Sequence, residues 1–176
     1  MTDDDLVSWP LSFRDDALKG QVCLVSGGGS GMGRAIAYVL VRLGAEVVIC
    51  GRRDEKLLAT AAGIKRLLKR DIMTQAMTIR DPQQVDELFA AAWQRFGHVD
   101  VLVNCAGGQY PQAAIDFSVK GWNAVIDTNL NGTWWMMQAA ARRWREAGRP
   151  GTIVTIVAVV ERGMPGVAIP ARPAPV

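Results

Sequence analysis

A glycine-rich loop is the first stretch of this chain whose residue types and spacing point to chemistry. It reads SGGGSGMG, from Ser26 to Gly33, between an apolar run and a helix-like stretch. Glycine permits positive φ angles and close backbone approach, and a helix N-terminus offers free N–H groups and partial positive charge. The loop therefore predicts a pyrophosphate cradle, although a tight turn alone would use similar residues. The residues expected to bind this ligand are Ser26, Gly27, Ser30, Gly31, Met32 and Gly33.

A pair of arginines follows the second apolar run, where a dinucleotide-binding domain contacts the adenosine ribose. An acidic residue at that strand end would hold the 2′-hydroxyl of NAD. This chain has Gly51 there, followed by Arg52 and Arg53. A guanidinium binds a 2′-phosphate bidentately and glycine leaves room for it, so the sequence predicts NADP(H). The alternative is an exposed arginine pair at a helix start, where basic charge is otherwise unfavourable.

These motifs need a scaffold that brings the ends of successive strands together. Short, continuously apolar runs alternate with helix-like stretches, and such runs are typical of strands covered on both faces. The expected strands are Gln21–Ser26, Ala45–Cys50, Val99–Asn104 and Thr152–Val157, with a weaker one at Ala76–Ile79. The expected helices are Gly33–Leu43, Asp54–Leu68, Pro82–Phe96 and about Val119–Arg145. The alternation predicts an α/β fold with a doubly wound parallel sheet, the Rossmann fold.

Local signals mark several helix ends and divide the chain. Asp81 before Pro82 is a good N-cap followed by proline at the first helical position. Glycines stand where helix C-termini need them, at Gly44, Gly97 and Gly148. We expect a leader over residues 1–20, an NADP-binding Rossmann domain over 21–162 and a proline-rich tail over 163–176.

Composition excludes several classes of function. The net charge is only +3, and no basic stripe with interleaved aromatic residues suggests nucleic acid. No apolar run reaches the ~18 residues of a membrane span, and the acidic start is no signal peptide. The three cysteines are far apart and lie in or beside apolar runs, which favours buried thiols in a reducing cytoplasm over a metal site.

Three motifs in order carry a resemblance to a known family. The spacing Ser26-Gly27-x-x-x-Gly31-x-Gly33 resembles the Thr-Gly-x-x-x-Gly-x-Gly loop of short-chain dehydrogenases/reductases. NCAG, residues 104–107, resembles that family's Asn-Asn-Ala-Gly, and DTNLNG, residues 127–132, resembles the segment with its catalytic asparagine. The resemblance covers about residues 18–167, and CGRR and NCAGGQYP make it most similar to the 2,4-dienoyl-CoA and trans-2-enoyl-CoA reductases.

The resemblance implies hydride transfer between NADP(H) and a small-molecule carbonyl or enoyl-thioester substrate. It assigns the catalytic asparagine to Asn129 and adds Asn104, Ala106 and Gly107 to the cofactor site. The family often has Asp-Val where this chain has Thr78 and Ile79, the residues expected at the adenine. A threonine hydroxyl still hydrogen-bonds an adenine amino group, but the bond is no longer charge-assisted.

The rest of the family's catalytic group is missing from these 176 residues. The family uses a serine and a Tyr-x-x-x-Lys pair, in which lysine lowers the tyrosine pKa. Here Arg42 follows Tyr38 by four residues and Ala114 follows Tyr110, while the serine position falls at about Ala158. We expect Tyr38 to be packed and Tyr110 to cover a loop or touch substrate. The chain therefore resembles a C-terminally incomplete, low-activity or inactive form.

The tail raises the question of why the resemblance stops. Four of the eight prolines lie between Pro165 and Pro175, and the last residues fit a shifted reading of GC-rich codons. We expect a frameshift near Ala168; the alternative is a natural proline-rich end.

The missing helix normally pairs with the long one here in family dimers. We therefore expect self-association through residues 119–145 and an apolar face at Trp134, Trp135 and Trp144 that has lost cover. The rival interpretations are a non-catalytic NADP(H)-binding or interaction protein and a fragment too incomplete to fold stably.

Overall fold

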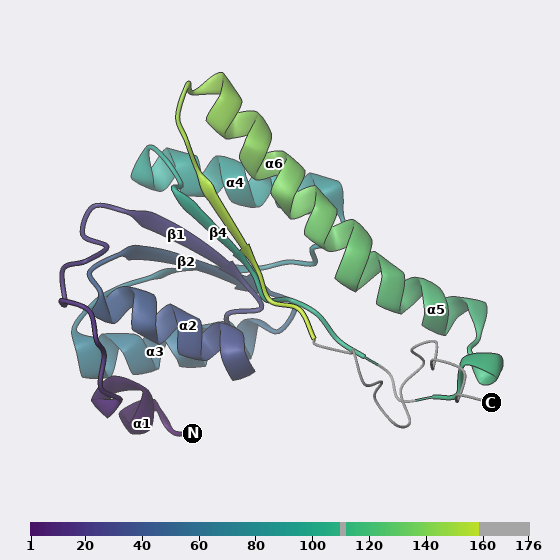
Figure 1. Cartoon of the computed structure of the whole chain (residues 1–176), viewed down its shortest axis with the longest axis horizontal. Coiled ribbons are helices and arrows are strands. Elements are labelled where there is room, and N and C mark those ends of the chain that lie inside the picture. The colour runs from purple at the N-terminus through teal and green to yellow at the C-terminus, as the bar shows by residue number, and fades with distance from the viewer. Residues whose placement is uncertain (110–111, 159–176) are drawn as a thin grey trace, which may run out of the picture.

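The computed structural model describes residues 1–109 and 112–158, except for the side chain of Ala114. Its centre is a parallel sheet of five strands in the order β3-β2-β1-β4-β5 (Figure 1). The strands are β1 (Val22–Ser26), β2 (Glu46–Gly51), β3 (Met73–Ala76), β4 (Val101–Asn104) and β5 (Thr152–Thr155). The doubly wound parallel sheet predicted from the sequence is confirmed.

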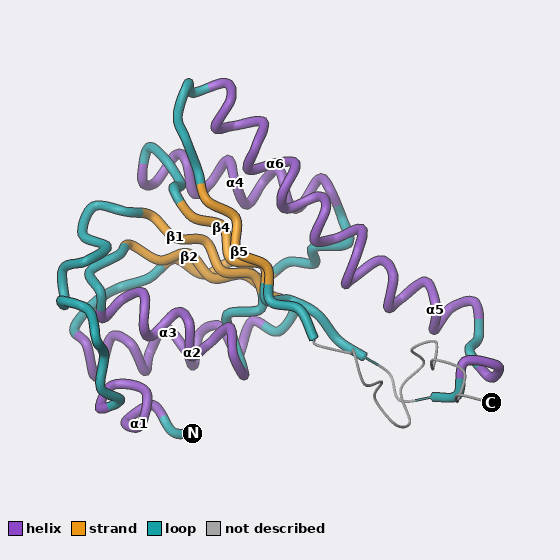
Figure 2. The backbone as a smooth tube through the Cα atoms, in the orientation of Figure 1, coloured by secondary structure: helices purple, strands orange, loops and turns teal. Residues whose placement is uncertain are grey.

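Helices cover both faces of this sheet (Figure 2). On one face lie α1 (Asp3–Ser8), α2 (Gly31–Arg42) and α3 (Asp54–Leu68); on the other lie α4 (Pro82–Phe96) and α6 (Thr133–Glu146). Successive residues of β1 enter opposite cores: Cys23 and Val25 pack toward α2 and α3, whereas Leu24 packs toward α4 and α6. Strand residues alternate between faces, so a strand covered twice must be apolar throughout.

The predicted helix ends agree with the structure. The Asp81 carboxylate accepts a hydrogen bond from the Gln83 N–H at 2.9 Å, and proline follows it at the first helical position. Gly44, Gly97 and Gly148 all have positive φ angles, as expected for helix C-termini.

The predicted position of β3 was wrong by three residues. The strand is Met73–Ala76 and pairs with β2, whereas Ala76–Ile79 was expected. Its sequence, MTQA, is half-buried at a sheet edge and therefore carries no apolar run. Met77 and Ile79 are buried, but they follow the strand.

The long predicted helix is divided by a π-helical segment. Helix α5 (Val119–Ile126) continues into η2 (Asp127–Gly132) and then into α6, and α5 extends away from the sheet (Figure 1). The interpretation of the tryptophans as one uncovered face was wrong for Trp144, whose indole is buried and donates to the Val99 carbonyl at 2.6 Å. Trp135 packs against the core, and of these three tryptophans only Trp134 is strongly exposed, at 51%.

Two searches of the described residues give negative findings. None of their helices is both long enough and apolar enough to cross a bilayer. No cluster of three or more His, Cys, Asp or Glu side chains in residues 1–109 and 112–158 is arranged to hold a metal ion.

Candidate cofactor-binding site

A cavity of about 280 Å³ opens at the carboxyl ends of β1, β2 and β4. This is where open α/β sheets bind ligands, in the crevice outside the strand ends. The predicted residues that line it are Gly27, Ser30, Gly31, Met32, Gly33, Arg52, Arg53, Thr78, Ile79, Ala106 and Gly107. The structure therefore brings together predicted residues from four separate segments of the sequence.

Two predicted residues lie behind the cavity rather than in its wall. The buried Ser26 hydroxyl accepts hydrogen bonds from the N–H groups of Cys105 and Ala106, each at 3.1 Å. Buried Asn104 lies at 3.5 Å from the Thr155 hydroxyl, and its Oδ1 has no partner among the described residues. Both side chains brace the junction between β1, β4 and β5.

The glycine-rich loop is shaped for close backbone approach. At Gly27, with φ +73°, a Cβ atom would lie 2.9 Å from the backbone nitrogen of Ala106. At Gly33 a Cβ would overlap the carbonyl group of Gly27. Only glycine fits these two positions, and the result is a tight loop that opens directly into α2. The cradle has the form that a pyrophosphate requires at a helix N-terminus.

The charge of the cavity wall is uniformly positive among the described residues. Arg52 and Arg53 line it, joined by Lys56 and Arg80, and no aspartate or glutamate lies in the wall. Sequence reasoning missed Lys56 and Arg80. Lys56 lies in the first turn of α3, and Arg80 directly follows Thr78 and Ile79, so their proximity to predicted site residues was the available signal.

Thr78 and Ile79, the residues expected at the adenine, are fixed by contacts with neighbouring segments. The Thr78 N–H donates to the Gln84 side chain at 3.0 Å, and its hydroxyl accepts from the Arg80 N–H at 3.3 Å. Ile79 packs against Gly132 of η2, where a Cβ would lie 2.6 Å from its Cγ1. Segments after β3 and within η2 therefore form one continuous wall.

Asn129 lies in the π-helical segment, and its side chain is already engaged. Its Oδ1 accepts from the Gly108 N–H at 2.9 Å, and its Nδ2 donates to the Gly108 carbonyl at 2.8 Å. Next to it, the Thr128 hydroxyl accepts from Arg80 at 2.6 Å. π-Helical segments occur frequently at functional sites, and here the segment joins the wall formed by Thr78 and Ile79 to the loop after β4.

Three reactive side chains are buried and therefore poorly placed for catalysis. Burial raises the pKa of the Cys23 and Cys50 thiols to about 12, so both are protonated near neutral pH. Tyr38 is fully buried, which confirms its expected packing, and burial raises the pKa of its hydroxyl. Tyr110 lies outside the described residues.

The fold and this cavity define a dinucleotide-binding domain of the Rossmann type. The family model described as short chain dehydrogenase matches residues 21–170. The chain therefore belongs to the short-chain dehydrogenase/reductase family, whose members are oxidoreductases that use NAD or NADP.

Curated relatives and solved structures agree with this membership. The chain is 37% identical over 151 residues to a probable 2,4-dienoyl-CoA reductase of Caenorhabditis elegans, covering 85% of this chain and 49% of the relative. It is 37% identical over 123 residues to an uncharacterized oxidoreductase of Staphylococcus aureus strain MW2, covering 70% and 52%. The chain spans about half the length of these relatives.

Two solved structures have a fold closely similar to that of this chain. A short chain dehydrogenase from Bacillus anthracis gives a TM-score of 0.80 at 38% identity, covering 86% of this chain and 61% of that one. A citronellol catabolism dehydrogenase from Pseudomonas aeruginosa PAO1 gives a TM-score of 0.82 at 36% identity, covering 90% and 64%.

Proposed function

We propose that this chain is the NADP(H)-binding part of a short-chain oxidoreductase that transfers hydride to or from a carbonyl or enoyl-thioester substrate. The observation that carries the proposal is the cavity wall, which has four cationic side chains and no carboxylate among the described residues. An NAD site would be expected to present a carboxylate to the ribose hydroxyls.

The cations are distributed in a way that fits a phosphorylated ribose. Arg52 and Arg53 lie in the turn after β2, and Lys56 lies in the first turn of α3. No ion pair joins any of these three to a carboxylate within the described part of the chain. They are therefore free to neutralise a 2′-phosphate, while the glycine-rich loop and the N-terminus of α2 face the pyrophosphate.

The residues of this chain hold and orient the cofactor in the proposed reaction. When bound, the nicotinamide ring supplies or accepts the hydride. Thr78 and Ile79 would lie against the adenine, and Ala106 and Gly107 line the same cavity after β4. Asn129 holds Gly108, the residue that follows this wall.

We propose that these 176 residues turn over substrate negligibly. They contain no Tyr-x-x-x-Lys pair, and general acid catalysis contributes about 10²–10⁴ in rate. The enoyl-thioester assignment is supported by the relative from C. elegans, which is a probable 2,4-dienoyl-CoA reductase. A non-catalytic NADP(H)-binding or interaction protein is the second candidate, favoured by the same missing pair.

Two further proposals concern the oligomeric state and the cellular compartment of the protein. The exposed side chains of Trp122, Leu130 and Trp134 support self-association through residues 119–145. The free thiols of Cys23, Cys50 and Cys105 support a reducing compartment, the cytoplasm.

Equilibrium binding of NADPH and NADH, followed by nucleotide fluorescence, tests the cofactor proposal. We expect NADPH to bind at least about tenfold more tightly, because charge-assisted hydrogen bonds contribute about 1.5–3 kcal/mol. The double variant Arg52→Ala/Arg53→Ala should lose this preference. Arg142→Ala/Arg145→Ala removes the same charge from an exposed part of α6 and should keep it. Equal affinity for both nucleotides in the unaltered chain would refute NADP(H) specificity.

A further inference from the structure

The N-terminal helix α1 is docked onto the helices that flank the cofactor cradle. Leu6 is only 4% exposed and packs in the core formed by α2, α3 and the sheet. Its carbonyl accepts a hydrogen bond at 2.9 Å from Arg42, the last residue of α2. A capping box between Thr2 and Asp5 begins the helix. Residues 1–20, expected as a leader, thus include an element of the fold.

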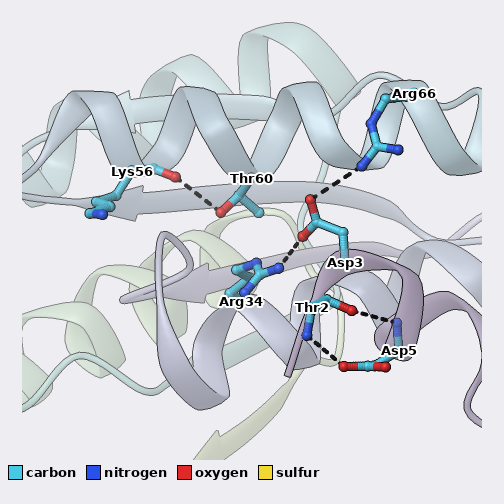
Figure 3. A network of polar contacts seen from close by, with 7 residues as sticks. All are labelled: Thr2, Asp3, Asp5, Arg34, Lys56, Thr60 and Arg66. Carbon is cyan, nitrogen blue, oxygen red and sulfur yellow. Dashed lines mark hydrogen bonds and ion pairs between the residues drawn. The ribbon is translucent and has the colours of Figure 1, made fainter.

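Asp3 is the polar centre of this contact (Figure 3). Its carboxylate accepts a hydrogen bond from Arg34 in the first turn of α2, and it lies 3.7 Å from Arg66 near the end of α3. Both Asp3 and Arg34 have side chains about three-quarters buried. Gly63 leaves the space: a Cβ there would lie 2.6 Å from Asp3 Oδ2. One carboxylate therefore links three helices.

The start of α2 lacks the usual stabilising groups. Its N-cap, Ser30, makes no side-chain capping bond to any described residue, and its first turn contains no acidic side chain. Arg34 instead places a cation near the positive end of the helix dipole, which is unfavourable. Asp3 supplies from α1 the negative charge that α2 does not contain.

The same contact lies beside the cofactor site. A second cavity of about 260 Å³ is lined by Asp3, Arg34 and Thr60, and it shares Lys56 and the loop residues 29–31 with the cofactor cavity. Asp3 therefore lines a cavity that adjoins the cofactor cavity along the glycine-rich loop.

We propose that α1 is a strap that orders the cofactor cradle, with Asp3 as the positioning residue for Arg34 and the first turn of α2. By holding this turn in its binding conformation before the cofactor arrives, the strap lowers the ordering cost of binding. The binding part of this inference rests on the proposed dinucleotide function; the ordering part does not.

A purely electrostatic effect on NADPH affinity and loss of the strap predict different results for substitutions of Asp3 and Arg34, so the two explanations can be distinguished. Asp3→Asn removes a negative charge beside an anion site, so electrostatics alone would tighten NADPH binding. Arg34→Gln removes a positive charge there, so electrostatics alone would weaken it. Loss of the strap is common to both variants and predicts weaker binding for both.

The experiment measures the NADPH dissociation constant and amide hydrogen exchange in the 176-residue chain. For Asp3→Asn and Arg34→Gln alike we expect a rise in Kd of about three- to tenfold and faster exchange over residues 27–37 without cofactor. Exchange in β4 should not change, which reports that the variants are folded. Asp4→Asn, in the same helical turn but exposed and outside these contacts, should match the unaltered chain, and Asp3→Glu should restore most of the affinity.

Opposite shifts in Kd for the two variants, or unchanged Kd in both, would overturn the strap. Unaltered exchange over residues 27–37 in both variants would overturn it as well. If the unaltered chain binds neither NADPH nor NADH, the proposed function fails, and the exchange measurements alone decide whether α1 orders the cradle.

Discussion

Strands β1 and β5 belong to the same parallel sheet, yet every residue of β1 is buried and every residue of β5 is exposed. Helices cover β1 on both faces and strands flank it on both edges. β5 lies at the sheet edge, where β4 is its only neighbour among the described residues. The cofactor half of the molecule is therefore packed by its own elements, whereas apolar side chains around β5 and α5 lack cover in the described structure.

The cradle should be the most sensitive point of the well-packed half. Gly27→Ala combines strain at a positive φ with overlap against the Ala106 backbone, which cannot move without shifting β4. We expect NADPH affinity to fall at least about 100-fold and the free energy of unfolding to fall by about 2–3 kcal/mol. Fluorescence titration and urea unfolding measure the two effects.

Gly20→Ala is the matched control for that prediction. Gly20 has φ +84°, but a Cβ there would meet nothing within 4 Å. The variant should lose about 1 kcal/mol from backbone strain alone and keep its NADPH affinity. Equal loss of affinity in both variants would mean that strain, rather than close approach to Ala106, explains the role of Gly27.

The difference in burial between β1 and β5 can be measured by making the same valine-to-alanine substitution in each strand. Val25→Ala in β1 deletes two methyl groups of a fully buried residue, whereas Val154→Ala in β5 deletes two methyl groups of a residue that is 43% exposed. We expect losses of about 2–3 kcal/mol for Val25→Ala and at most about 0.5 kcal/mol for Val154→Ala in urea unfolding. Comparable losses would show that β5 is covered in solution, by a second copy or another segment.

Features set by neighbouring residues could be predicted from the sequence, whereas features that depend on tertiary packing could not. The loop, the strand ends and the caps at Asp81 and Gly97 were predictable because glycine, proline and capping residues act on their immediate neighbours. The position of β3 was not, because an edge strand such as MTQA carries no apolar run. Trp144 was misplaced because helical spacing alone does not say which face meets the core. The role of Asp3 depends on Arg34, 31 residues away, and no local pattern signals it.

A glycine-to-alanine substitution within helix α3 should lower stability, whereas the same substitution usually stabilises a helix. Gly63→Ala should stabilise a helix by about 1 kcal/mol through propensity. Here the added Cβ would overlap Tyr38 and Asp3, so we expect a net loss of about 1–2 kcal/mol. In Gly121→Ala in α5, the added Cβ would lie 3.2 Å from the Ser118 hydroxyl and 3.7 Å from the Phe117 ring, with no severe overlap, so the variant should be neutral or stabilising. Thermal melting of both variants gives the two signs, and stabilisation by Gly63→Ala would show that Tyr38 and Asp3 do not pack closely against Gly63.

The smallest expected effect is a pH dependence of the α1 contact. Partial burial alone would raise the pKa of the Asp3 carboxyl, but the hydrogen bond from Arg34 and the nearby positive charges of Arg34 and Arg66 hold it below its ordinary value. A lowered pKa in the folded state means that stability from Asp3 is fully present above about pH 4 and is lost as the pH falls through the folded-state pKa. The unaltered chain should therefore melt higher than Asp3→Asn at pH 7, by an amount corresponding to about 1 kcal/mol, and the difference should shrink below pH 4. Asp4→Asn controls for the general loss of one carboxylate. A melting difference that stays constant from pH 7 to pH 3 would mean that Asp3 stabilises the fold through packing rather than through its charge on Arg34.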